Sequence, residues 1–520
     1  MSTASPTLNP DACYQALQAR DARFDGVFFT GVTSTGIYCR PVCRVRTPRR
    51  ENCRFFTLPA QAEGAGFRPC LRCRPELAPQ AQAWSIQDAS DTLASQAARL
   101  LDEPDAWPDG LPTVEQLAAR LGVSDRHLRR LFEARLGVSP LQYLQTRRLL
   151  TAKQLLADSD LPVTQVALAS GFASVRRFNA AFAQHYGLSP TQVRREGARP
   201  AQGRVTVRLG YRPPYDVDAM LGFFGTRAIE GMEQVEGRSL ARTLAITNGG
   251  RTCAGWLVAR FDDSQPVVTL EVGDGLREVL PLVIRRLRAT LDLDADPAVI
   301  QARLESHFPG TAGLRVPGTL NGWELAVRAV LGQQITVAAA RTLARRLVDR
   351  FGAPLETPVP GLHRLFPAPQ VLADAEGNAL GELGIVRQRQ AAIVALARAT
   401  ADGTLQLHAG ADVPATIEAL KALPGIGDWT AQYIAMRALR WPDAFPAGDV
   451  ALHKALGVQQ ERQPARAAEA ASQAWRPWRS YAVIRAWHGL GAPAPALPAA
   501  NAATAPQRPA PGARSTTPTH

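Results

Sequence analysis

Two close pairs of cysteines constrain the first 80 residues of this chain more than any other feature. Cys39 and Cys43 enclose three residues, Cys70 and Cys73 enclose two, and 26 residues separate the two pairs. This spacing suits one tetrahedral zinc ion held by four thiolates. A module of this size with few aliphatic residues would gain much of its stability from such an ion. A purely structural zinc site is the default interpretation of four cysteine ligands.

The cysteine count also bears on where the protein works. The 520-residue chain has seven cysteines, an odd number, and no apolar stretch follows a basic N-terminus. This combination argues against export and against a disulfide framework. No apolar run is long enough to span a bilayer. We therefore expect a cytoplasmic, monomeric protein without membrane contact, in which Cys13 and Cys53, outside the paired spacing, are packing residues.

Positive charge gathers in two blocks of the N-terminal part. The formal net charge is +13, of which residues 1–80 carry +5 and residues 111–200 carry +7. Clustered arginine predicts a polyanionic partner, most simply double-stranded DNA. The alternative, a solubilising surface, usually intersperses both signs.

The cysteine segments RDARFDGVFFTGVTSTGIYCRPVC, RRENCRFF and GFRPCLRCRPE resemble the methyl-accepting N-terminal domain of Ada-type alkylation-response proteins. The resemblance covers nearly all of residues 11–77. It implies a zinc cofactor and a methyl group transferred from a DNA methylphosphotriester to Cys39. A zinc-bound thiol is already a thiolate, which is the nucleophilic form. Arg40, Arg44 and Arg46 are predicted to hold the neighbouring DNA phosphates.

Two helix-turn-helix patterns follow, at residues 113–138 and 163–188. Each has a Gly-containing turn, a serine cap (Ser124 or Ser174) and a basic second helix. One copy is common in helical bundles, but two copies joined by a helix favour DNA binding. The segment, ending in GLSPTQVRR, resembles AraC-type regulators, which implies transcriptional activation with RNA polymerase as a further partner. The predicted inner faces comprise Leu128, Leu131, Phe132, Phe178 and Phe182. The arginines left for DNA are Arg126, Arg129, Arg130, Arg176 and Arg177.

The segment ALKALPGIGDWTAQYIAMRAL, residues 419–439, predicts two helices joined by a tight hairpin. Gly425 and Gly427 let backbone N–H groups at the start of the second helix face a DNA phosphate. A turn that contacts protein is the alternative. Asp449 follows in FPAGDVALHKALG, and its spacing alone also suits an ordinary helix N-cap.

The hairpin followed by Asp449 is similar to the HhH-GPD superfamily of base-excision glycosylases. YRPPYDVDAMLGFF, WELAVRAVLGQQITVAAA and WRPWRSYAVIRAW more narrowly resemble AlkA-type 3-methyladenine glycosylases, and the likeness covers residues 205–490. It implies excision of flipped N-alkylated purines such as 3-methyladenine and 7-methylguanine. These bases are cationic and leave as neutral molecules, so little general-acid help is needed. The resemblance assigns Asp449 the task of stabilising an oxocarbenium-like sugar and guiding water.

The same resemblance implies how the base is held. A cationic base is attracted to aromatic faces, and the aromatic residues at matching pocket positions are Phe223, Trp429, Tyr433 and Trp487. Gln334 stands where a wedge residue fills the gap left by the flipped base. Trp429 also stands where lyase-competent relatives carry a Schiff-base lysine, which favours a monofunctional hydrolase without strand cleavage.

The predicted fold is multidomain and mainly α, with α+β parts. The predicted domains are a small zinc-bound α/β methyl-acceptor module at 1–80, a double helix-turn-helix domain at 85–198, an α+β cap domain at 205–290, a helix-hairpin-helix glycosylase domain at 291–490 and a disordered, Ala- and Pro-rich tail at 491–520. Two alternatives stay open. One is a transcription regulator with an inactive glycosylase half, and the other is a glycosylase with a purely structural zinc domain.

Overall fold

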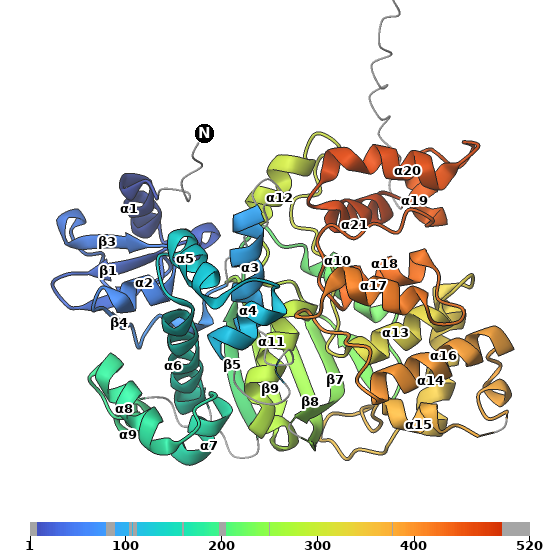
Figure 1. Ribbon diagram of the computed structural model, residues 1–520, viewed down its shortest axis with the longest axis horizontal. Coiled ribbons are helices and arrows are strands. Elements are labelled where there is room, and N and C mark those ends of the chain that lie inside the picture. The colour runs from blue at the N-terminus through green and yellow to red at the C-terminus, as the bar shows by residue number, and fades with distance from the viewer. Residues whose placement is uncertain are drawn as a thin grey trace, which may run out of the picture.

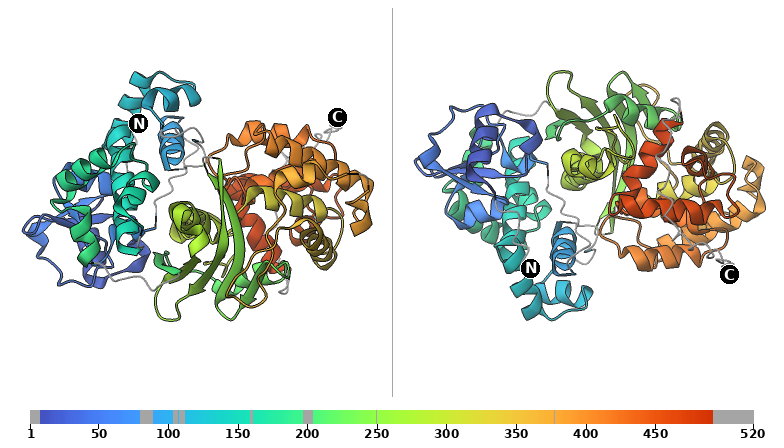
Figure 2. Two further views of the ribbon diagram at one scale, coloured as in Figure 1. Left: turned by 90° about the horizontal axis from the view of Figure 1, so that it is seen from below. Right: turned by 90° about the horizontal axis from the view of Figure 1, so that it is seen from above.

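The computed structural model describes residues 8–79, 89–102, 107, 112–158, 161–196, 204–248, 250–376 and 378–490. The zinc module and the helix-turn-helix units lie on one side of the molecule, and the glycosylase helices lie on the other (Figure 1). A five-stranded sheet, with helix α11 (Leu280–Thr290) packed against it, lies between them (Figure 2). The predicted mainly α, multidomain fold is confirmed. The predicted disordered tail, 491–520, lies outside the described residues.

The N-terminal module is a four-stranded sheet flanked by helices. The strand order is β3-β1-β2-β4, and β2 runs parallel to β4 while β1 pairs antiparallel with β2 and β3. The elements are α1 (Pro10–Ala19), β1 (Phe29–Val32), β2 (Ile37–Cys39), β3 (Cys53–Phe56), α2 (Pro59–Gly64) and β4 (Arg68–Pro69). The β2–β4 register pairs Tyr38 with Pro69, so Cys39 and Cys70 come out side by side at the strand ends.

The second part contains both helix-turn-helix units on a long central helix. Its elements are α3 (Ala89–Asp102), α4 (Val114–Arg120), α5 (Asp125–Leu136), α6 (Pro140–Asp158), α7 (Val163–Ala169), α8 (Val175–Tyr186) and α9 (Pro190–Glu196). Ser124 caps α5 and Ser174 caps α8, each accepting a backbone N–H at 3.3 Å. The predicted inner faces are confirmed, because Leu128, Leu131, Phe132, Phe178 and Phe182 are all buried.

The third part is an antiparallel sheet of order β5-β9-β8-β7-β6. Its elements are β5 (Arg204–Gly210), α10 (Val217–Gly225), β6 (Glu233–Glu236), β7 (Ser239–Asn248), β8 (Arg251–Phe261), β9 (Val267–Gly273) and α11 (Leu280–Thr290). Burial alternates along β5, so Val205, Val207 and Leu209 face inward. Their core continues through Leu77 into the second helix-turn-helix unit.

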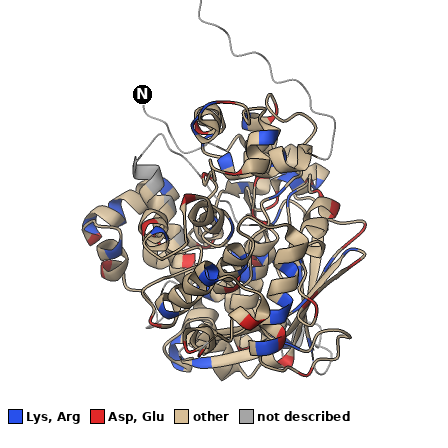
Figure 3. Ribbon diagram, turned by 90° about the vertical axis from the view of Figure 1, so that its right-hand side faces the viewer, with Lys and Arg blue, Asp and Glu red and all other residues tan. Residues whose placement is uncertain are grey.

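The remaining helices form two cores that share α18. They are α12 (Pro297–Leu304), α13 (Gly322–Leu331), α14 (Val337–Phe351), α15 (Pro369–Ala373), α16 (Arg387–Ala401), α17 (Val413–Lys421), α18 (Asp428–Arg437), α19 (Val450–Ala455), α20 (Pro464–Ser472) and α21 (Arg479–Gly489). Ile434 of α18 belongs to one core and Met436 to the other. Both signs of charge are interspersed on this side (Figure 3). Among the described helices, none combines the length and apolarity that a membrane crossing requires.

Arg212 joins the zinc module to the glycosylase half. The residue is 1% exposed. Its guanidinium donates to the backbone carbonyls of Asp25 at 2.9 Å and Pro79 at 3.4 Å, and to that of Asp294 at 2.7 Å. The two backbones are also close here, because a Cβ added at Gly210 would lie 3.7 Å from the Leu77 carbonyl oxygen. The two halves are therefore docked through a buried polar contact.

Replacing this arginine should weaken the docked structure. In Arg212→Met the carbonyls lose a charged donor and stay buried, so we expect the free energy of unfolding to fall by roughly 2–3 kcal/mol. Chemical denaturation measures this. Arg208→Met, at an exposed position on β5, should change the free energy of unfolding by less than about 0.5 kcal/mol. Equal effects of the two variants would contradict the role of Arg212.

Glu63 is a buried carboxyl between the zinc module and the helix-turn-helix part. It accepts hydrogen bonds from Tyr38 Oη at 3.0 Å and Thr146 Oγ1 at 2.9 Å. Burial raises the pKa of Glu63 to about 7, although Thr146, Tyr38 and the charge of Lys153 act in the opposite direction.

This raised pKa makes stability depend on pH. Between the ordinary value of 4.5 and about 7, the folded protein holds a proton that the unfolded chain has released. The free energy of unfolding should therefore fall by about 3 kcal/mol across that interval and then level off. Chemical denaturation from pH 5.5 to 8 gives the free energy of unfolding of wild type and of Glu63→Gln. The difference between the two proteins should change with pH. For the control Glu51→Gln, at an exposed side chain, the difference in free energy of unfolding from wild type should not change with pH. A difference for Glu63→Gln that also stays constant would refute the raised pKa of Glu63.

Candidate functional site

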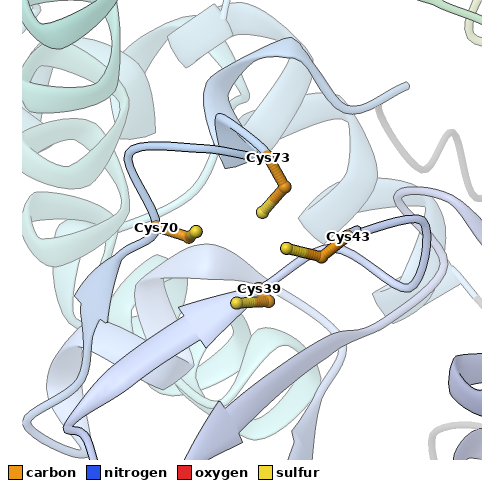
Figure 4. A group of neighbouring side chains, drawn as sticks. All are labelled: Cys39, Cys43, Cys70 and Cys73. Carbon is orange, nitrogen blue, oxygen red and sulfur yellow. The ribbon is translucent and has the colours of Figure 1, made fainter. Parts of the chain in front are cut away.

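The four paired cysteines meet at one end of the small sheet (Figure 4). Their Sγ atoms all lie within 4.8 Å of one another. Cys39 ends β2, while Cys43, Cys70 and Cys73 lie on the loops beside it. Four sulfur donors at this separation can all reach one tetrahedral zinc ion, so the donor set fits the predicted metal. Cys13 and Cys53 are buried outside the cluster, as predicted for packing residues.

Arg40 supports the cluster from inside the protein. Its backbone N–H donates to Cys73 Sγ at 3.3 Å, and its Nη1 donates to the Cys73 carbonyl at 3.1 Å. Its Nε donates to Asp25 Oδ1 at 2.8 Å, and its Nη2 also pairs with that carboxylate. The residue is 8% exposed. Because the guanidinium is occupied by internal partners, the prediction that Arg40 holds a DNA phosphate is wrong; Arg44 and Arg46 are exposed and stay predictions.

The helix-turn-helix arginines lie on the second helix of each unit. Four of them are exposed: Arg126, Arg130, Arg176 and Arg177. Arg129 is partly exposed and pairs with Glu115 at 3.3 Å and Asp125 at 3.8 Å. Their contacts with DNA stay predictions.

Asp449 caps a helix and also lies among aromatic side chains. It is the N-cap of α19, where Oδ1 accepts the Leu452 N–H at 2.6 Å. Its carboxylate also accepts two indole N–H bonds, from Trp429 at 2.8 Å and from Trp487 at 3.1 Å. These three donors fix the orientation of a carboxylate that lines a cavity.

That cavity has a volume of about 300 Å³ and aromatic walls. The rings of Trp429 and Tyr433 stack, with centroids 5.3 Å apart and planes at 9°. Trp487 is tilted against Tyr433, with centroids 6.4 Å apart. Flat, electron-rich walls beside a fixed carboxylate suit an aromatic, cationic ligand.

Phe223 does not line this cavity, whereas its neighbour Phe224 does. The Phe223 ring is already engaged by two guanidinium groups, with Arg227 Cζ at 3.8 Å and Arg437 Cζ at 4.8 Å from its centroid. The pocket role of Phe223 stays a prediction. Arg227 and Arg437 line the cavity, and sequence reasoning missed both. The position of Arg437, one helical turn after Tyr433, was an available signal.

Four charged residues, two buried and two partly buried, also line the cavity and hold its walls together. Arg242 pairs with Glu233 at 2.7 Å and with Glu324 at 2.6 Å. Arg328 pairs with the same two carboxylates at 2.6 and 2.7 Å. Burial acts to raise the pKa of Glu233, but Arg328 and Arg242 outweigh it, and the pKa is lowered. This ring of alternating charge ties β6 and β7 to α13.

The predicted hairpin connects α17 to α18. Gly425 has φ +75°, a conformation that favours glycine, and an added Cβ would lie 3.4 Å from the Gln388 carbonyl. Gly427 is the N-cap of α18 and supplies no capping side chain. Gln333, which the sequence analysis did not single out, donates to the Gly425 carbonyl at 2.9 Å. Gln334 follows it in an exposed turn with φ +55°, and its wedge role stays a prediction.

The zinc cluster, the paired helix-turn-helix units and the hairpin beside an Asp449 cavity define a class of protein. It is a zinc-containing transcriptional regulator combined with a helix-hairpin-helix DNA glycosylase. Four protein families match in this order: "Metal binding domain of Ada" at residues 12–76, "Helix-turn-helix domain" at 117–196, "AlkA N-terminal domain" at 206–321 and "HhH-GPD superfamily base excision DNA repair protein" at 327–480.

One curated relative matches nearly the whole chain, and others match one part of it. A probable bifunctional transcriptional activator/DNA repair enzyme AlkA of Mycobacterium tuberculosis is 39% identical over 93% of this chain and 97% of its own. DNA-3-methyladenine glycosylase 2 of Escherichia coli is 33% identical over 54% of this chain and 97% of its own. The Ada protein of Escherichia coli is 36% identical over 36% of this chain and 50% of its own. The chain belongs to the family of bifunctional Ada/AlkA-type transcriptional activators and DNA repair glycosylases, with zinc as cofactor and DNA as partner.

Proposed function

We propose that the glycosylase half excises N-alkylated purines, 3-methyladenine and 7-methylguanine, as a monofunctional hydrolase. The observation that carries this proposal is the Asp449 carboxylate, fixed by two indole N–H bonds in an aromatic cavity. A flipped cationic base would stack on Trp429 and Tyr433 and leave as a neutral molecule. Asp449 would stabilise the positive charge that develops on the sugar and would guide water to it.

The hairpin is the element of this half that binds the DNA backbone. Gly427 leaves the N–H groups of the first α18 turn without a side-chain cap, which suits a phosphate at a helix N-terminus. Gln334, exposed in the turn next to the Gln333–hairpin contact, would fill the gap in the duplex.

Asp449→Asn tests the catalytic assignment. The amide keeps an oxygen for the Leu452 N–H but loses the negative charge, so release of 3-methyladenine from alkylated DNA should fall by about 10²–10³-fold. Binding to DNA that carries an abasic site should be retained. Glu461→Gln, an exposed change in the same domain, should keep full activity. Equal base release by Asp449→Asn and wild type would refute the assignment, whereas no base release by wild type would favour a regulator with an inactive glycosylase half.

We propose that Cys39 accepts a methyl group from a DNA methylphosphotriester. The Cys39 sulfur attacks the methyl carbon, an S–C bond forms, and the C–O bond breaks. The phosphodiester anion then leaves with the electron pair. Zinc, when bound, keeps the thiol in its thiolate form. The methyl group stays on the protein, so each chain reacts once.

Labelled methylphosphotriester DNA tests this step. Wild type should acquire one methyl group, which peptide mass spectrometry should locate on Cys39. Cys39→Ala should acquire none, whereas Cys53→Ala, at a buried cysteine outside the cluster, should react like wild type. A wild-type protein that binds zinc but gains no label would support a purely structural zinc domain.

We further propose that the protein activates transcription as a cytoplasmic monomer that contacts RNA polymerase. Two recognition helices within one chain, α5 and α8, supply what dimeric regulators obtain from two subunits. We propose the same domain boundaries that the sequence predicts: 1–80, 85–198, 205–290 and 291–490.

A further inference from the structure

A cavity of about 280 Å³ lies between the zinc module and the second helix-turn-helix unit. Ile37, Val45 and Cys70 line it from the zinc module. Leu188 and Val193, around the start of α9, line it from the helix-turn-helix part. Ile37 and Val45 also pack against the buried sulfur cluster that includes Cys39 and Cys70. The cavity therefore leads to the zinc ligands and has walls from two domains.

The charged residues that line this cavity are all basic. They are Arg68, Arg72 and Lys153, and the described lining contains no carboxylate. Arg68 and Arg72 are exposed, and Arg68 Nη1 donates to the Tyr186 carbonyl of α8 at 3.1 Å. Lys153 is 2% exposed, and its Nζ donates to the Cys70 carbonyl at 3.2 Å and pairs with the Glu76 carboxylate at 2.7 Å, so its charge is already neutralised. The site thus combines apolar walls with exposed cations at the edge of the metal cluster.

We propose that this interdomain cavity is the binding site for the methylated phosphate of the DNA backbone. The inference rests on the proposed methyl transfer and deepens it. The neutral methyl ester would lie against Ile37, Val45 and Leu188, while Arg68 and Arg72 contact the charged phosphates on either side. An unmodified phosphodiester carries a full charge, and the apolar side chains of Ile37, Val45 and Leu188 have no hydrogen-bond donor to replace the hydration it would lose against them. The cavity therefore selects the alkylated phosphate by its lack of charge.

The cavity also explains how the ester reaches the reacting sulfur. It touches the cluster at Cys70, and the Cys39 and Cys70 Sγ atoms lie within 4.8 Å of each other. A methyl group at the Cys70 wall is thus close to the proposed acceptor. The second helix-turn-helix unit becomes part of the damage-recognition site, because α8 and the start of α9 close one side of it.

Two variants at Leu188 test the effect of a negative charge introduced into the cavity wall. Leu188→Asp and Leu188→Asn have nearly the same shape, but only the aspartate would repel the DNA backbone. Methyl transfer from a methylphosphotriester oligonucleotide should be at least about tenfold slower in the Asp variant than in the Asn variant. Methyl iodide reports on the thiolates alone, because it is small and carries no phosphate. Both variants should react with it at one rate.

Arg72→Gln gives a second test at an exposed position where folding is not at risk. The slope of log affinity against log salt for methylphosphotriester DNA should become smaller by about 0.9, the loss of one phosphate contact. Arg260→Gln, at an exposed position on β8, should leave the slope unchanged.

The outcomes separate this inference from the proposed function. If wild type is methylated on Cys39 but the two Leu188 variants react equally and the Arg72→Gln slope is unchanged, the cavity assignment is overturned and the methyl acceptor stands. If wild-type protein takes no methyl group from DNA, both are overturned.

Discussion

Asp25 is the residue on which both halves of the molecule converge. Its carboxylate binds the guanidinium of Arg40, whose backbone N–H donates to a zinc-ligand sulfur, Cys73 Sγ. Its backbone carbonyl accepts a hydrogen bond from Arg212 of the glycosylase half. A buried guanidinium is stable only when its donors are satisfied, so these contacts require the zinc module and the glycosylase to stay together. The core that runs from the second helix-turn-helix unit under the five-stranded sheet strengthens the same association.

The base cavity depends on a similar junction between separate elements. Helix α18 lies between two hydrophobic cores and presents Trp429, Tyr433 and Arg437 on one side. The Glu233–Arg242–Glu324–Arg328 ring brings two strands of the sheet against α13 on the other. Each charge in this ring has two opposite partners, which offsets the cost of burying it. The cavity is therefore held open by polar contacts and not by apolar packing alone.

Local sequence patterns predicted the elements that depend on neighbours in the chain. The serine caps and inner faces of both helix-turn-helix units follow from 3.6-residue periodicity, which needs no remote partner. The cysteine pairs likewise predicted a metal cluster. Arg40 was wrongly assigned because its partners, Asp25 and Cys73, are distant in sequence. An arginine beside a zinc ligand has the same local pattern whether it faces DNA or an internal carboxylate.

The sequence by itself determined the order of the modules, the metal donor set and the hairpin, because spacing and local propensity fix these features. The reactive candidates Cys39 and Asp449 came from the family resemblance and not from spacing. Only the tertiary structure decided which charges are exposed and which bind partners inside the protein. It also decided that Asp449 faces Trp429 and Trp487, that Gln333 holds the hairpin, and that a cavity joins the zinc cluster to the second helix-turn-helix unit. The physical reason is that burial and hydrogen-bond partnership belong to pairs of residues far apart in the chain, and no single segment contains both members.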